Sequence, residues 1–135
     1  MRKILFRGKR IDNGEWVEGH YGEYMLMSGE SIPGISIPNK ESVCGSICYD
    51  VEASTVGQYT GVVDKNGKKI FEGDIIKTCG QHSCFDKVEF LDGLAGFYAV
   101  NDDIHIPAEL ATLKKNFIEV IGNIHDNPEL LEVEK

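Results

Sequence analysis

Short apolar stretches separated by turn residues recur along the whole chain. Asn-Gly or Asp-Gly pairs stand between β-prone runs at residues 12–14, 64–67 and 92–93. Such pairs are the strongest short-range signal for a β-hairpin, and Asn-Gly favours a type I′ turn, whose two central residues need positive φ. The flanking runs alternate apolar and polar residues, so one face of each strand should be buried. The pattern therefore predicts a chain of short hairpins.

The densest part of this pattern is residues 54–77. Gly73 separates two apolar pairs, Ile70-Phe71 and Ile75-Ile76. A glycine in that position predicts a bend or bulge that turns the chain into a new strand. Three short strands joined this tightly form a meander, which is a building block of small barrels.

Outside the hairpins the pattern is less regular. Glycines and prolines interrupt residues 27–46, which predicts a long loop or a loosely paired excursion, although Ile35 and Ile37 alternate as in a short strand. Residues 107–115 are the best helix candidate, because Pro107 suits a first helical position and Ala, Glu and Leu follow it. Residues 127–131 predict one helical turn with Asn127 as its N-cap.

Length and charge narrow the class of protein. At 135 residues the chain should form one domain, or two β subdomains at about 1–53 and 54–135. The net charge of −8, with a basic excess only near the start, disfavours nucleic acid as a partner. No apolar run reaches the roughly 18 residues of a membrane span, and the first apolar run is too short for a secretory signal. We therefore expect a cytoplasmic protein.

Four cysteines offer one candidate metal site. Cys44 and Cys48 form one pair and Cys79 and Cys84 the other, with His82 inside the second pair. Tetrahedral zinc takes four thiolate or imidazole ligands, but these spacings are looser than a zinc knuckle. Reduced, partly buried thiols are the favoured interpretation. The sequence therefore predicts no bound metal and no cofactor.

Other candidate site residues have ordinary structural explanations. Glu72 and Asp74 resemble a paired carboxylate, but Asp74 accepting backbone N–H bonds in a turn explains them better. Trp16, the only tryptophan, is interpreted as a core or interface anchor. Tyr59 is a further candidate binding residue. We predict no catalytic residues.

Several of these residues carry a family resemblance. It rests on residues 55–61, Asp64, Asn66-Gly67 and residues 72–76, and it extends to residues 6–9, Trp16 and Gly19 near the start and residues 119–124 and 127–130 near the end. These blocks resemble the signature of the YopX-like family of small phage and prophage proteins. The resemblance implies SH3-like β-barrel or roll elements, and it implies no established activity.

The predicted fold is thus mainly β, with SH3-like barrel or roll elements built from short hairpins and one short helix near the C-terminus. We expect a non-enzymatic protein that binds a host or phage protein or forms a homo-oligomer, since open β-rolls leave edge strands to be covered. One alternative is a single-stranded nucleic-acid-binding small barrel. A second is an enzyme with its site near Glu72 and Asp74.

Overall fold

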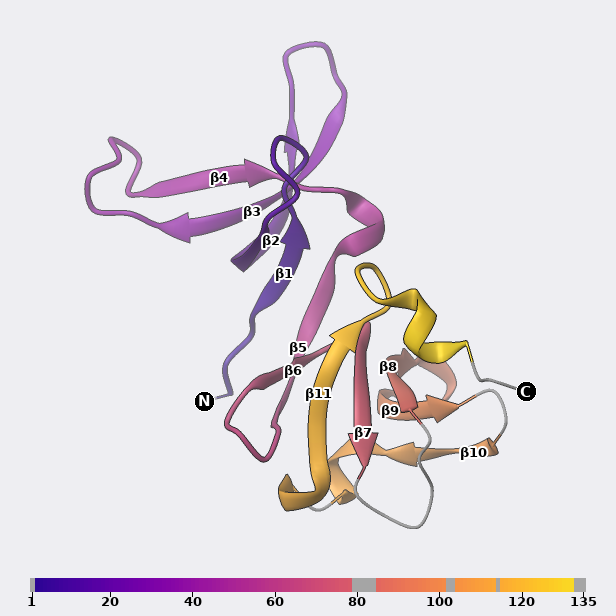
Figure 1. Ribbon diagram of the computed structural model, residues 1–135. Helices are drawn as coiled ribbons and strands as arrows, with labels where there is room; N and C mark the ends of the chain where they lie inside the picture. The colour runs from indigo at the N-terminus through magenta and orange to yellow at the C-terminus, as the bar shows by residue number, and fades with distance from the viewer. Residues whose placement is uncertain (1, 79–84, 102–103, 114, 133–135) are drawn as a thin grey trace. The chain divides into compact units, whose positions relative to one another are not determined.

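The chain forms two compact units, Met1–Gln58 (unit 1) and Tyr59–Lys135 (unit 2). Our computed structural model describes residues 2–78, 85–101, 104–113 and 115–132 (Figure 1). The mainly β prediction is confirmed, because strands dominate both units and the helices of the described residues are short 3-10 turns. The strands of the described residues all pair antiparallel, and the sheets that they form are open rather than closed into a barrel.

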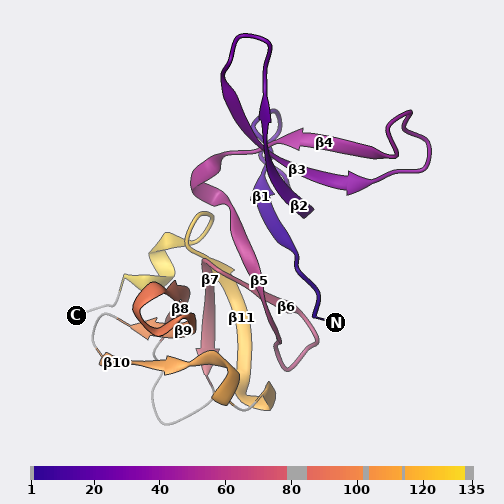
Figure 2. The same cartoon turned by 180° about the vertical axis from the view of Figure 1, so that it is seen from behind.

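Unit 1 is a sheet whose strands follow the order β4-β3-β2-β1-β5. Its long second strand joins two hairpins, because Trp16–Gly19 pair with β1 and His20–Met25 pair with β3. The strands are β1 (Phe6–Lys9), β2 (Trp16–Met25), β3 (Ser31–Pro38), β4 (Ser46–Asp50) and the first residues of β5 (Gly57–Val63). In Figures 1 and 2 the β2–β3 and β3–β4 hairpins point in different directions.

The first predicted hairpin is confirmed, but its predicted turn type is wrong. Gly14 has a φ of 73°, whereas Asn13 does not have positive φ. The turn is closed by Gly14 N donating to Arg10 O and Arg10 N donating to Glu15 O. A four-residue loop, residues 11–14, that ends in one left-handed glycine therefore replaces the two-residue type I′ turn.

The prediction of a long loop or a loosely paired excursion at residues 27–46 is wrong for Ser31–Pro38, which form β3 between two partner strands. The alternation of Ile35 and Ile37 did indicate this strand. Its two prolines lie at the ends of its ladders. Pro33 lies at the end of the β3–β4 ladder, where its carbonyl still accepts from Val51 N, and Pro38 lies beyond Ser36, the last residue that pairs with β2. A proline removes a backbone donor only where a neighbouring strand would use it, so these two are tolerated.

The sheet of unit 1 is closely packed where β2 crosses from β1 to β3. A Cβ added at Gly19 would lie 2.3 Å from the backbone oxygen of Ser36, so only glycine fits. Ile35 and Val51 are fully buried near this crossing, and the rings of Phe6 and Tyr21 pack 5.8 Å apart. The buried centre of unit 1 is therefore small.

Unit 2 is built on a five-stranded sheet in the order β10-β9-β8-β7-β11. Its strands are β6 (Lys69–Phe71), β7 (Asp74–Thr78), β8 (Phe85–Leu91), β9 (Gly96–Asn101), β10 (Ile104–Glu109) and β11 (Ile118–Asn123). One cluster of buried residues forms its core: Ile70, Ile76, Val88, Ala99, Leu110 and Ile118. Figure 2 shows β7 beside β11, with which it pairs.

The predicted meander of three strands is only partly correct. The hairpin of β5 and β6 forms, but its turn is not the predicted type I′, because Gly67 has positive φ and Asn66 does not. Gly73 makes the expected bend with a φ of 86°. The strand after the bend does not pair back onto β6, because β7 pairs with β8 and β11 instead. Burial of Ile75 and Ile76 in a sheet with partners on both sides explains this choice.

Asp64 holds the β5–β6 turn against β11. Its Oδ1 accepts from Asn66 N (2.8 Å) and Lys68 N (2.9 Å), and its Oδ2 accepts from Val120 N (3.0 Å). Burial alone would raise the pKa of this carboxyl, but the three backbone donors and the charge of Lys68 outweigh it, so the pKa lies below its ordinary value. Asp64 is thus a structural residue linking positions far apart in sequence.

The predicted helix at residues 107–115 is wrong. Ala108 and Glu109 instead continue β10 and pair with Ala99 and Tyr98 of β9. Short 3-10 turns follow at Leu110–Thr112 and Lys115–Phe117. Strand pairing therefore overrides the helix propensity of the local sequence.

Two smaller predictions near turns also need correction. Pro128–Leu131 forms a 3-10 turn, but the Asn127 side chain does not cap it and instead accepts from Asn123 N (3.3 Å). The third hairpin forms between β8 and β9, with its left-handed residue at Ala95 rather than Gly93.

Candidate functional site

The outer edge of β4 in unit 1 has no partner strand among the described residues. Ile11 N donates to Asp50 O (3.0 Å) at one end of this edge, while Val51 N donates to Pro33 O (3.2 Å) on the β3 side. Because backbone groups alternate in direction along a strand, Asp50 and Cys48 direct theirs away from β3. The N–H and C=O of Cys48 therefore face an open edge.

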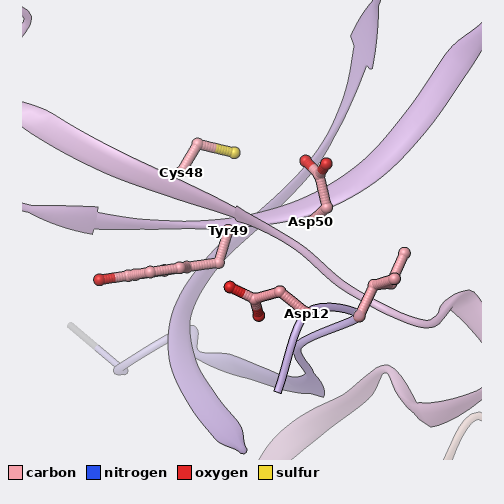
Figure 3. Close-up of a pocket in the computed structure, with 5 residues that line it drawn as sticks. Asp12, Cys48, Tyr49 and Asp50 are labelled. Atoms are coloured by element: carbon pink, nitrogen blue, oxygen red, sulfur yellow. The ribbon is translucent and has the colours of Figure 1, made fainter. Parts of the chain in front are cut away.

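A hollow of about 280 Å³ lies at this edge; we call it the edge hollow. It is lined by Ile11, Asp12, Cys48, Tyr49 and Asp50. Figure 3 shows the Cys48 and Asp50 side chains on one side of β4 and Tyr49 on the other, with Asp12 beside Tyr49. The hollow therefore has a carboxylate on each face of the sheet.

Arg10 contacts both Tyr49 and Asp12 on one face of the edge hollow. Its guanidinium carbon lies 4.3 Å from the centre of the Tyr49 ring, and its Nε and Nη2 donate to the Asp12 carboxylate at 2.9 and 2.6 Å. These hydrogen bonds raise the pKa of Arg10 and lower the pKa of Asp12. Glu15 lies 3.9 Å from the same guanidinium. The positive charge of Arg10 and the three carboxylates of Asp12, Glu15 and Asp50 together give this region a net charge of −2.

On the other face of the sheet, where the Cys48 side chain lies, Tyr24 packs beside Cys48. A Cβ added at Gly34 would lie 2.6 Å from the Tyr24 ring and 2.8 Å from Cys48 Sγ, so the glycine makes room for both side chains. A hydrogen bond with Cys48, together with burial, raises the pKa of Tyr24, while Ser36 opposes the shift. Cys48 is therefore held in place from its own face of the sheet.

Unit 1 also exposes apolar side chains at its hairpin tips. Met25 and Met27 at the β2–β3 tip are 79% and 108% exposed, and Val43 between β3 and β4 is 105% exposed. Leu26 lies between the two methionines and is also exposed. Apolar side chains gathered at a loop tip are typical of protein-contacting surfaces.

Trp16 is covered by charged neighbours. The guanidinium of Arg7 lies 4.6 Å from the ring centre and the ammonium of Lys9 lies 5.7 Å from it. Arg7 is itself buried. These cations already contact the ring that a stacked base would need, so the arrangement resembles a packing anchor more than an open platform.

The remaining candidates lie in unit 2. Tyr59 packs its ring 5.7 Å from that of Phe71, and Asp74 is buried with its Oδ2 accepting from Phe71 N (2.8 Å). Glu72 is half-buried. The geometry gives Asp74 the turn-stabilising role of a buried hydrogen-bond acceptor.

Two of the four cysteines can be placed. Cys44 and Cys48 are free and exposed, whereas Cys79, His82 and Cys84 lie outside the described residues. The described part of the chain contains no group of three or more His, Cys, Asp and Glu side chains arranged to hold a metal ion. The described residues therefore test neither the favoured interpretation of reduced thiols nor the alternative of a four-cysteine zinc site.

Sequence reasoning missed most of the edge hollow. The sequence presents Cys48 only as a candidate metal ligand, and it does not single out Asp12, Tyr49 or Asp50. Their shared position depends on β4 being the outermost strand and on Ile11 pairing with Asp50. No local motif encodes that order of strands, so the sequence carries no direct signal for the site.

The fold and site define a mainly β protein with an open strand edge, and in the described residues no helix is long and apolar enough to cross a membrane. A family model described as YopX protein matches residues 5–132. The chain therefore belongs to the YopX family, as the resemblance in its sequence predicted.

Two solved structures are similar over nearly the whole chain. Protein EF1440 from Enterococcus faecalis shares 27% identity, with a TM-score of 0.57 over 97% of this chain and 99% of that one. Protein YopX from Bacillus subtilis shares 17% identity, with a TM-score of 0.56 over 100% of both chains. The second likeness shows the fold alone. A comparison with curated proteins found no match.

Proposed function

We propose that this chain is a non-enzymatic protein-interaction module that self-associates by strand addition at the outer edge of β4. The observation that carries the proposal is the Cys48 backbone, whose N–H and C=O face an edge that has no strand partner among the described residues and lies beside the edge hollow. An open strand edge pairs with an incoming extended segment through main-chain hydrogen bonds, and adjacent pockets select its side chains.

The wider setting of the proposal follows from the family resemblance. The module acts in the cytoplasm of a host cell that carries the phage or prophage gene, and small SH3-like roll elements provide the frame on which the edge is presented. Its partner is a second copy of the chain. A host or phage protein is the alternative occupant of the same edge.

A proline at position 48 tests the edge directly. In Cys48→Pro the ring replaces the N–H that faces away from β3, while the residues that bond to β3 keep their donors. We expect wild-type protein to associate with rising concentration in sedimentation velocity, and Cys48→Pro to remain monomeric. Cys48→Ala removes the thiol but keeps the N–H, so it should associate like wild type.

Two outcomes contradict the proposal. Wild-type protein that stays monomeric at about 100 μM would contradict the proposed self-association, since an interface with a Kd of about 1 μM is largely formed at this concentration. Equal association of Cys48→Pro and wild type would place the interface elsewhere. Circular dichroism of both variants establishes that each one folds.

A further inference from the structure

The chemistry at the edge hollow identifies the segment that fits it, if the proposed self-association is correct. A strand added beside β4 directs successive side chains to opposite faces of the sheet. One face offers the Asp50 carboxylate, and the other offers Asp12 and Glu15 around Arg10. The edge therefore suits an extended segment with two consecutive basic residues.

This chain contains four such pairs of adjacent basic residues, and their positions differ. Lys9-Arg10 lies in and beside β1, Lys68-Lys69 lies in the β5–β6 turn and β6, and Lys114 is outside the described residues. Arg2-Lys3, by contrast, lies in residues 2–5, which belong to no strand. Arg2 and Lys3 are both exposed, and the following Ile4 is 51% exposed.

We infer that residues 2–5 of one copy add to the β4 edge of a second copy. Arg2 and Lys3 then face the two acidic sides of the edge, and the Ile4 side chain is withdrawn from water. Exchange in both directions gives a closed dimer with two identical contacts, as two-fold symmetry requires. Charge complementarity of this kind fixes the register of a contact and excludes wrong partners.

A charge-swap pair of variants tests this assignment. Variant A carries Arg2→Glu and Lys3→Glu, and variant B carries Asp12→Lys and Asp50→Lys. Each variant alone opposes like charges at its own contact, so self-association should weaken at least about tenfold. A mixture of A and B restores opposite charges at both contacts, and native mass spectrometry should show the mixed dimer in excess over either homodimer.

The mixture also guards against misfolding, because a mixed dimer forms only from two folded partners. Lys68→Glu with Lys115→Glu gives the same change in net charge as variant A at exposed positions of unit 2, and it should associate like wild type. Wild-type-like association of A and B would overturn the inference while leaving strand addition by another segment possible. Loss of association in both variants, with no mixed dimer formed when they are combined, would also overturn the inference.

The experiments distinguish failure of this inference from failure of the proposed function. If Cys48→Pro abolishes association while the charge swaps have no effect, the β4 edge is the interface and residues 2–5 are not its occupant. If wild type is monomeric, both the proposed self-association and this inference are wrong.

Discussion

Unit 2 buries far more apolar side chain than unit 1. Among the described residues eight apolar side chains are buried in unit 2, and only Ile35 and Val51 are buried in unit 1. Unit 1 instead exposes Met25, Met27 and Val43 at its hairpin tips. Burial of apolar surface is the main favourable term in folding, so the contrast separates a unit built around a core from one that presents surface.

The carboxylates show the same contrast. Asp64 and Asp74 of unit 2 are each 1% exposed and accept backbone N–H bonds that fix turns. Asp12 of unit 1 has a side chain that is 64% exposed, and Asp50 is also exposed at the edge hollow. The two acidic residues at the edge hollow of unit 1 therefore lie at the surface, whereas Asp64 and Asp74 of unit 2 are part of the fold.

The largest expected effect is loss of a core side chain in unit 2. Ile76 is fully buried in the central cluster, so Ile76→Ala should lower the free energy of unfolding by about 3–4 kcal/mol. Met27→Ala at the exposed tip of unit 1 should change it by less than about 0.5 kcal/mol. Urea unfolding followed by circular dichroism measures both, and equal losses would contradict the contrast between the units.

Removing the Asp64 carboxylate should have the next largest effect. Asp64→Ala leaves the backbone donors of Asn66, Lys68 and Val120 without their acceptor, which should cost about 3 kcal/mol of unfolding free energy. Asp64→Asn keeps one acceptor oxygen and should lose less. An alanine variant as stable as wild type would show that the turn does not depend on this residue.

The lowered pKa of Asp64 predicts a smaller effect, which is a loss of folding stability at low pH. The folded-state pKa of Asp64 is below its ordinary value, so the ionised form stabilises the folded chain. This contribution is complete above roughly pH 5 and is lost as the pH falls through the folded-state pKa. Thermal melts of wild type between pH 6 and pH 3 should show a decline that Asp64→Ala shows less strongly.

The smallest predicted effect concerns the face of unit 1 next to β4. Gly34→Ala places a Cβ against Tyr24 and Cys48, two exposed side chains that can move, so it should cost about 1 kcal/mol. Gly22 is its cross-strand partner and has only Tyr24 atoms at 3.9 Å or beyond. Gly22→Ala is therefore the matched control, and a loss equal to that of Gly34→Ala would contradict the close packing around Gly34.

Local signals predicted much of the fold. The hairpins around Gly14 and Gly67 and the bend at Gly73 follow from residues that accept positive φ, and all three are present. The errors arose where pairing with a distant strand overrode local preference. Pro33 and Gly34 suggested a loop, and Pro107 suggested a helix, yet both regions are strands because their neighbours supply hydrogen bonds.

The candidate site was less predictable than the fold. Cys48 is one of four candidate cysteines in the sequence, but its relevance here comes from the direction of its backbone groups. That direction depends on the register of β3 with β4 and on the pairing of Ile11 with Asp50. Register between strands is set by packing over the whole sheet, and no short motif specifies it.

Amide hydrogen exchange of wild-type protein, measured by NMR at low and high concentration, tests strand addition at β4 most directly. The amides of Ile47 and Tyr49 are directed toward β3 and should be protected at both concentrations. The amide of Cys48 faces the open edge, so it should exchange fast in dilute protein and become protected as the protein associates. Fast exchange at Cys48 in the associated state would contradict strand addition at this edge.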